Sequence, residues 1–540
     1  MHRLTRLAPS AVLIAATALS VAACSSSAST SPGANSSTPT QGGSLTFIQQ
    51  IEPSCLDPVQ LGDMHQATFA LQYLDSLVAT DADGKVLPWL ATSWEISPDG
   101  KVYTFRLKEG VKFTDGTPFD AAAVKANFDR IKTTTGSASQ YLIYVDKTEV
   151  VDANTVEVAL SRPFVPFLQQ IAQSFVGIQS PTALKRGDDE NCQSPVGTGP
   201  FIVDSYTPGD QAVLVRNEDY NSAPPTAEHD GPAYVDQVVW RFIPDPTARF
   251  SAVKTGQADA ADGLTAINEK QAAKDDSLAV QSHDYPGHPE GVMFKTNLAP
   301  FDDVRVRQAF KYGADVDAAL ESIFFGLYER PGVLSPTTTD FDPSSVDAYT
   351  HDPDKANALL DEAGWTERTA DGYRVKDGES LTVHWLINEG SQLDTYRTFA
   401  EQIQATEKEI GIEVVFESAP ATDWTAYTKP EYQATYMKYT LNSPDVLRLL
   451  WATDAFINTD GLFVDDPDLQ KAVSDAAIES DPAKRSELYA TAQQRISDQA
   501  YGLTLFPESV RILSNTSRVQ GIRQEPVLGL VNLQDAWVTK

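Results

Sequence analysis

Strand-like and helix-like stretches alternate along most of this 540-residue chain, and that mixture limits the available folds more than any other feature. Residues 101–113 alternate apolar and polar side chains, as a strand with one buried face does. A helix is expected to follow Asp120, which can cap it, with Val124 and Phe128 on its apolar stripe. Strands mixed with helices throughout predict an α/β body.

The same signals predict further elements. Strands are expected at 44–48, 147–151, 155–160, 211–216 and 235–242. Helices are expected after three Asp-Pro pairs, because Asp caps a helix and Pro fits its first turn: Asp245-Pro246, Asp352-Pro353 and Asp481-Pro482. No repeat of 20–50 residues is visible, which disfavours a solenoid or a propeller.

Composition supports a folded body and limits its partners. Hydrophobic residues make up 41% of the chain, which is typical of globular proteins. The length suggests about three domains or one large bilobed body. The net charge of −32 argues against nucleic acid and anionic lipid as primary partners, since both attract Lys and Arg.

The N-terminus has the features of an export signal. Arg3 and Arg6 precede an apolar stretch at 7–20 that is too short to span a membrane, and residues 21–24 read VAAC. This order resembles the lipobox of bacterial lipoproteins, which implies a signal peptide at 1–23 and a lipid on Cys24. The alternative is an ordinary export signal with an incidental cysteine.

Residues 24–43 are expected to form a flexible tether, because this Ser/Thr-rich stretch has no large apolar side chain. No later apolar run approaches the length of a membrane-spanning helix. We therefore expect an extracytoplasmic protein, anchored to the outer face of the cell membrane by lipid on Cys24.

The chain has three cysteines. If Cys24 carries lipid, Cys55 and Cys192 remain as a pair in an oxidising compartment, which favours a disulfide. Two separately buried thiols are the alternative.

Signatures of catalysis and of metal binding are missing from the sequence. No G-x-S-x-G or G-x-x-x-x-G-K-[ST] motif occurs, and the seven His form no H-E-x-x-H. Ser251 and Lys254 match S-x-x-K, but Lys254 also belongs to a K-T-G match, and one lysine cannot serve both. We expect no enzymatic activity, no catalytic residues, no cofactor and no metal site.

Residues 84–131 carry the most specific pattern in the chain, and it resembles the signature region of the family 5 extracellular solute-binding proteins. The matched segments are LPWLA at 87–91, SPDG at 97–100, YTF at 103–105, GVKF at 110–113 and DGTP at 115–118. Further matches follow in the family's order: LDP at 56–58, PVGTGPF at 195–201, TGQAD at 255–259, VRQA at 306–309 and AGW at 363–365. The resemblance runs from about residue 44 to the C-terminus.

This resemblance implies a two-lobed α/β fold like that of periplasmic binding proteins, of type II and the large cluster C type, with an extra subdomain inserted in lobe one. It implies that two strand-like crossovers join the lobes, with the ligand in the cleft between them. The expected divisions after the tether are 44–80, 195–288 and 505–540 for lobe one, 81–194 for the inserted subdomain and 289–504 for lobe two.

The resemblance also implies candidate ligand contacts. In the family the segment after Leu-Asp-Pro lines the cleft, which here is Gly62, Asp63, Met64 and His65, although an exposed loop is the alternative. Trp424 is a candidate for stacking on the ligand or for the core. Glu508 is a candidate because it lies near the return to lobe one.

Peptide binders of the family have a Trp-x-x-Asp segment whose Asp pairs with the peptide amine. Here Tyr439 replaces the Trp, and Asn442 falls where the Asp would be. Asn lacks the charge for a charge-assisted bond. Asp445 is expected either to supply that charge or to cap a helix at 446–451.

The function implied is that of the substrate-binding protein of an ABC importer. We expect a monomer that captures a small solute, preferably a peptide or peptide-like compound, and delivers it to the membrane permease and ATPase subunits. An oligosaccharide, an opine or a metal chelate is the alternative ligand. A secreted hydrolase, supported only by Ser251 and Lys254, is the remote alternative function.

Overall fold

The computed structural model describes residues 38–60, 63–134, 138–346, 348–389, 393–420, 424–455 and 457–539. Residues 1–39 and 40–540 are separate units. The predicted signal peptide, most of the predicted tether and Cys24 lie outside the described residues. Within the described part, no helix combines the length and the apolar character needed to cross a membrane.

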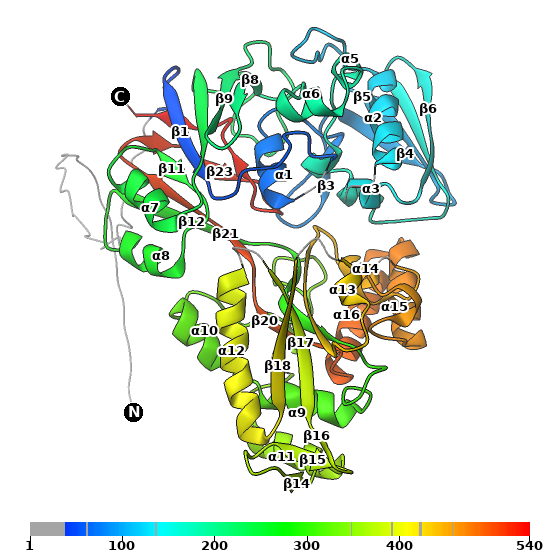
Figure 1. The fold of residues 1–540 in the computed structure, drawn as a ribbon. Helices are drawn as coiled ribbons and strands as arrows, with labels where there is room; N and C mark the ends of the chain where they lie inside the picture. The colour runs from blue at the N-terminus through cyan, green and yellow to red at the C-terminus, as the bar shows by residue number, and fades with distance from the viewer. Residues whose placement is uncertain are drawn as a thin grey trace, which may run out of the picture. The chain divides into compact units, whose positions relative to one another are not determined.

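A seven-stranded sheet forms the centre of what we call lobe one (Figure 1). Its order is β12-β21-β11-β1-β10-β9-β8. The strands are β1 Ser44–Gln49, β8 Phe201–Thr207, β9 Gln211–Arg216, β10 Gln237–Phe242, β11 Ala260–Ala261, β12 Leu278–Asp284 and β21 Ser509–Asn515. β1 is parallel to both neighbours. Phe47 from β1 and Trp240 from β10 are fully buried, with ring centroids 4.5 Å apart.

A four-stranded antiparallel sheet, β4-β5-β7-β6, forms a subdomain within lobe one. It consists of β4 Ala91–Ile96, β5 Val102–Leu107, β6 Val145–Asp152 and β7 Thr155–Leu160, with helix α2 Ala121–Thr133 packed on β6 and β7. The expected alternation is confirmed, since Tyr103 and Phe105 are buried and Arg106 is exposed. The strand ends at Leu107 rather than 113, because a turn with Gly110 at φ 78° follows.

A five-stranded sheet, β18-β17-β19-β13-β20, forms the centre of lobe two. Its strands are β13 Gly287–Phe294, β17 Thr382–Glu389, β18 Glu413–Pro420, β19 Ala434–Thr440 and β20 Gly502–Phe506. β17 is parallel to β18 and β19, so these three strands end at one edge. The helices α9 Val304–Gly313, α10 Val316–Phe324, α11 Pro353–Glu362 and α12 Leu393–Ile410 complete this core.

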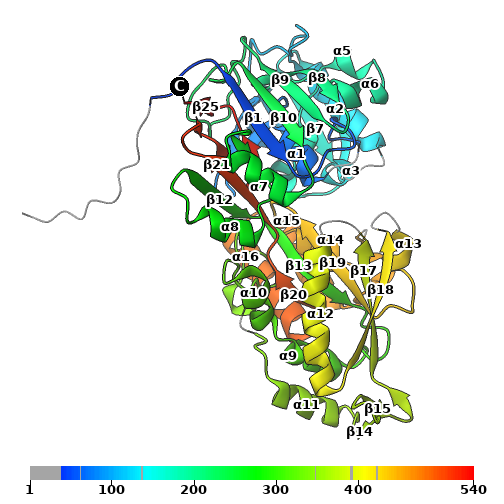
Figure 2. The ribbon, with the colours of Figure 1, turned by 60° about the vertical axis from the view of Figure 1, so that its left-hand side comes forward.

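Three helices of lobe two pack beside the inserted subdomain: α14 Val446–Trp451, α15 Pro467–Ile478 and α16 Pro482–Asp498. The backbone N–H of Val165, in the subdomain, donates to the carbonyl of Ala477 at 2.9 Å. The two lobes therefore touch far from the strands that connect them (Figures 1 and 2).

The shorter elements complete the description. The helices are α1 Met64–Ala70, α3 Ala138–Tyr141, α4 Phe167–Gln170, α5 Pro181–Leu184, α6 Asp188–Gln193, α7 Pro246–Lys254, α8 Ala266–Ala272 and α13 Trp424–Tyr427. The strands are β2 Val78–Thr80, β3 Val86–Pro88, β14 Glu367–Arg368, β15 Arg374–Lys376, β16 Glu379–Ser380, β22 Val519–Gln520, β23 Arg523–Gln524, β24 Val531–Asn532 and β25 Trp537–Val538.

Two short crossovers join the lobes. One is 285–286, between β12 and β13, and the other is 507–508, between β20 and β21. They run side by side, since the N–H of Tyr285 donates to the carbonyl of Glu508 at 2.8 Å. These are the two connections that the resemblance implied, and bending there would move one lobe against the other.

Candidate functional site

The edge of the lobe two sheet that faces lobe one is formed by the ends of its three parallel strands (Figures 1 and 2). In α/β folds, ligands bind beyond the carboxyl ends of parallel strands. Three predicted contacts lie at this edge. Trp424 begins α13 just after β18, Tyr439 belongs to β19, and Asn442 follows β19. The side chain of Trp424 is outside the described part.

Asn442 makes a contact across the cleft. Its Nδ2 donates to the carbonyl of Gln169 at 2.7 Å, and its Oδ1 accepts from Nε2 of Gln173 at 2.9 Å. Both partners belong to the inserted subdomain of lobe one, and Asn442 is only 3% exposed. Asn442 therefore holds the lobes together in this structure.

Asp445 was expected either to supply a charge to the ligand or to cap the helix at 446–451, and its side chain instead pairs with a buried arginine in this structure. Its carboxylate is fully buried and accepts from Nε and Nη2 of Arg448, at 2.9 and 2.7 Å. It begins α14 but makes no side-chain capping bond. Burial lowers the pKa of Arg448, but pairing with Asp445 outweighs it and raises that pKa. The charge of Asp445 thus serves a buried ion pair inside the protein.

The lobe one side of the cleft is formed by the start of α1. Asp63 caps this helix, its Oδ1 accepting from the N–H of Gln66 at 2.9 Å, and its side chain is 51% exposed. Nε2 of His65 lies 3.1 Å from Nε2 of Gln50. Met64 is half-buried against the core. Gly62 falls outside the described residues.

Glu508 belongs to a charge cluster beside the crossovers. Lys438 from β19 lies 2.6 Å from Glu508 and 3.6 Å from Glu290 of β13. Burial raises the pKa of Glu290 to about 7, although Lys438 lowers it. The Lys438 and Glu508 side chains are 30% and 22% exposed, so two of the three charges reach solvent.

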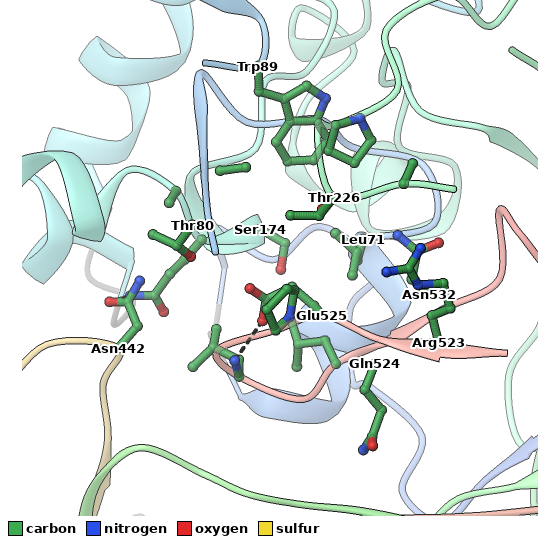
Figure 3. A pocket seen from close by; sticks show the side chains of 18 of the residues that line it. Leu71, Thr80, Trp89, Ser174, Thr226, Asn442, Arg523, Gln524, Glu525 and Asn532 are labelled. Carbon is green, nitrogen blue, oxygen red and sulfur yellow. Dashed lines mark hydrogen bonds between the residues drawn. The ribbon is translucent and has the colours of Figure 1, made fainter. Parts of the chain in front are cut away.

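A small cavity lies between lobe one and Asn442 (Figure 3). It encloses about 40 Å³. Its polar lining includes Thr80, Gln173, Asn442, Arg523, Glu525, Asn532 and Asp535. Glu525 accepts from the N–H of Val527 at 3.2 Å and of Leu528 at 2.6 Å. Burial raises the pKa of Glu525 to about 7, although these two N–H groups lower it.

Sequence reasoning missed Glu525 and this cavity. The residue lies between β23 and β24. The rest of the lining comes from Leu71 just after α1, from β2, from Trp89 and 172–174 of the inserted subdomain, from 224–227, from Asn442 and from the C-terminal segment 523–535. A larger cavity of about 440 Å³ adjoins the same region and is lined from both lobes, including Lys85, Gln169, Ser443 and Arg485. No local motif marks either space, because each is formed by segments far apart in the chain.

The predicted disulfide between Cys55 and Cys192 is present, with a Cα–Cα distance of 4.5 Å. The N–H of Leu56 donates to the carbonyl of Cys192 at 2.9 Å, and the neighbouring Asp57 is buried against Arg130 at 2.6 Å. The bond therefore joins two parts of lobe one beside the Leu-Asp-Pro segment.

The geometry supports neither a hydrolase active site at Ser251 and Lys254 nor a metal site made by the protein's own side chains. Ser251 and Lys254 are both exposed on α7, and Lys254 lies 3.9 Å from Asp275. They therefore have no enclosed site for a nucleophile and its base. In the part of the chain that is described, no group of three or more His, Cys, Asp or Glu side chains is arranged to hold a metal ion.

Residues 85–457 match the family described as bacterial extracellular solute-binding proteins, family 5. The chain belongs to this family. Family 5 proteins bind solutes outside the cytoplasm for ABC importers, which places this chain among transporter components rather than enzymes.

Relatives of this family 5 protein cover most of its length. The glutathione-binding protein GsiB of Pectobacterium atrosepticum is 29% identical over 499 residues, covering 90% of this chain and 92% of its own. The nickel-binding periplasmic protein of Escherichia coli is 28% identical over 458 residues, covering 82% and 84%. Among solved structures, NikA from Brucella suis, in complex with Fe(III)-EDTA, has a TM-score of 0.79 at 24% identity, covering 92% and 100%. The predicted fold is therefore confirmed.

Proposed function

We propose that this family 5 protein captures a peptide or peptide-like solute in the cleft between its lobes and delivers it to the permease and ATPase subunits of an ABC importer. One observation carries the proposal. Side chains from both lobes line the same cleft, and only two short crossovers join the two lobes. Hinge bending at 285–286 and 507–508 would close these side chains around a solute.

The proposed ligand contacts are Gly62, Asp63, Met64, His65, Trp424, Tyr439, Asn442 and Glu508. Asp445 would act indirectly, by fixing α14 behind Asn442 through Arg448. A peptide-like solute is supported by the relative that binds glutathione, which is itself a small peptide. A metal chelate is the competing ligand, because another relative binds nickel.

Native mass spectrometry of the full-length protein, purified gently from its source in mild detergent, tests this function. We expect a bound solute that raises the unfolding midpoint when added back and that reduces the radius of gyration in X-ray scattering. At a solute concentration one hundred times Kd, binding adds about 2.7 kcal/mol to stability. A protein that changes neither quantity with peptides, opines, sugars or metal chelates would contradict the proposal.

The anchor is a separate part of the proposal. Lipid on Cys24 would hold the protein at the outer face of the cell membrane as a monomer. We expect wild-type protein to fractionate with membranes and a Cys24→Ser variant to be released. Equal membrane association of both would leave the solute-binding function standing and remove the lipid anchor.

A further inference from the structure

Glu525 is a carboxylate in a cavity without a counter-charge. In the described residues its carboxylate oxygens accept only from the backbone N–H groups of Val527 and Leu528, and no ion pair reaches them. Backbone N–H groups satisfy its oxygens but carry no net charge. A buried carboxylate in this position costs free energy unless a cation or a proton neutralises it.

The basic side chain that lines the cavity, Arg523, is already paired with carboxylates. Arg523 lies 2.8 Å from Glu228 and 3.4 Å from Asp535. His229 also pairs with Asp535, at 2.6 Å. The cavity therefore contains more acidic than basic charge, and Glu525 is the acidic group without a partner of opposite charge.

The size of the cavity limits what could supply the missing charge. About 40 Å³ has room for roughly three water molecules, since one water needs about 10–15 Å³. A primary ammonium on a short methylene stem, such as n-propylammonium, is of this size. Its three N–H donors would find the carboxylate of Glu525 and the neutral oxygens of Thr80 and Asn442 on the walls of the same cavity.

The cavity borders the cleft, and it also shares Trp89, Pro224 and Ala227 with a hollow of about 570 Å³ on the surface of lobe one. Asn442 is its lining residue from lobe two, and Leu71, at the end of α1, lines it from lobe one. Figure 3 shows Glu525 and Asn442 on the wall of the same space. Opening the lobes would remove Asn442 and expose the cavity to the cleft.

We propose that this cavity binds a primary ammonium group of the transported solute, with Glu525 as its counter-charge. The proposal rests on the solute-binding function above and adds the charge and size of one group of the solute. Glu525 would then select cationic over neutral and anionic compounds of the same length.

The test uses n-propylammonium as probe, with 1-propanol and propionate as neutral and anionic probes of equal length. The reporter is the amide of Leu528, which donates to Glu525, in full-length protein labelled with ¹⁵N-leucine. We expect a saturable shift of this resonance with propylammonium. Binding of 1-propanol should be at least tenfold weaker, and propionate should leave the resonance unchanged.

Two variants decide the role of the carboxylate. Glu525→Gln should weaken propylammonium binding at least tenfold, while Glu525→Asp should keep part of it. Glu401→Gln, on the exposed face of α12, is the matched control and should bind as wild type does. Circular dichroism checks that each variant is folded. Equal binding to Glu525→Gln, equal binding of 1-propanol, or no saturable shift with propylammonium would overturn the proposal.

A pH series gives an independent readout. Affinity for propylammonium should rise from pH 5 to pH 8 as Glu525 ionises. The other charged groups around it are Arg523, Asp535 and His283, whose Nε2 bonds to the carbonyl of Val527 at 2.8 Å. A His283→Gln variant should keep this rise, and a profile that is flat or that disappears with His283→Gln would contradict the assignment to Glu525.

These experiments distinguish a failure of the ammonium site from a failure of the proposed function. A purified solute that closes the lobes with the same affinity for wild type and Glu525→Gln would overturn the ammonium site and leave solute binding intact. A protein that binds propylammonium at Glu525 but closes on no peptide, opine, sugar or chelate would contradict the proposed function alone.

Discussion

Replacing Asp445 with Asn separates a structural role from a ligand-binding role at this position. Asn keeps the shape of the side chain but removes its charge, so the Arg448 guanidinium is left buried with no anionic partner. The Arg448 side chain is 2% exposed, and solvent therefore screens almost none of the lost interaction. Breaking such a buried pair typically costs about 3–5 kcal/mol.

The surroundings of Arg448 place the expected cost at the lower end of that range. Its guanidinium carbon lies 5.4 Å from the ring centre of Tyr144 and 5.6 Å from that of Phe164. Contacts of this kind contribute about 0.5–2 kcal/mol and remain in the variant. We therefore expect Asp445→Asn to lower the free energy of unfolding by about 3 kcal/mol.

Urea unfolding followed by circular dichroism measures this loss, provided that the m-value, the slope of the unfolding free energy against urea concentration, stays unchanged. The double variant Asp445→Leu with Arg448→Met should recover most of the stability, because apolar side chains of similar volume can replace a buried pair. An Asp445→Asn variant that lies within 1 kcal/mol of wild type in stability and binds solute more weakly would refute a structural role for this carboxylate. That result would return Asp445 to the ligand contacts.

Three further predictions concern stability and closure. Glu407 is fully buried, with no partner for either carboxylate oxygen in the described residues, and burial raises its pKa well above the ordinary value. Its folded pKa exceeds its unfolded pKa, so stability should fall as pH rises between the two, and urea unfolding of Glu407→Gln should show a flatter pH profile. Replacing Cys55 and Cys192 together with Ala should cost about 2–5 kcal/mol in the same assay, because the bond closes a loop of 137 residues. Asn442→Ala removes two hydrogen bonds between the lobes and should increase the radius of gyration of the solute-free protein. Gln173→Ala should do so to a smaller extent, and an unchanged radius in both variants would contradict a role of these bonds in holding the lobes together.

Local signals predicted individual elements well, because their causes lie within a few residues. Asp120 caps α2 by accepting from the N–H of Ala123, as expected. The Asp-Pro pairs begin α7, α11 and α16, and the helix expected at 446–451 has those bounds. The helix α15 begins at another Asp-Pro pair, Asp466-Pro467, so its start carried the same local signal and was missed. The helix α12 and the lobe two sheet were not predicted from local patterns, since their identity depends on packing partners distant in sequence.

The expected boundaries between the lobes stay predictions. The bounds of the strands in the two large sheets can nevertheless be compared with them. The strands of the seven-stranded sheet come from the segments 44–80, 195–288 and 505–540. β13 begins at Gly287 and β20 ends at Phe506, each two residues beyond the expected span 289–504. The crossovers are only two residues long, so hydrophobic patterns cannot mark where one lobe ends.

The candidate site was the hardest part to predict, because residue type alone does not say which charges are free. Asp445 and Glu525 are both acidic residues in segments near the cleft, yet Asp445 faces a guanidinium at hydrogen-bond distance and Glu525 faces only backbone N–H groups. That difference depends on Arg448, one helical turn from Asp445, and on the absence of a comparable cation near Glu525 among the described residues. A free carboxylate attracts a cationic ligand more strongly than a paired one. Under the proposal for Glu525, pairing inside the protein would therefore select the charge of the solute more than the number of acidic residues around the cleft.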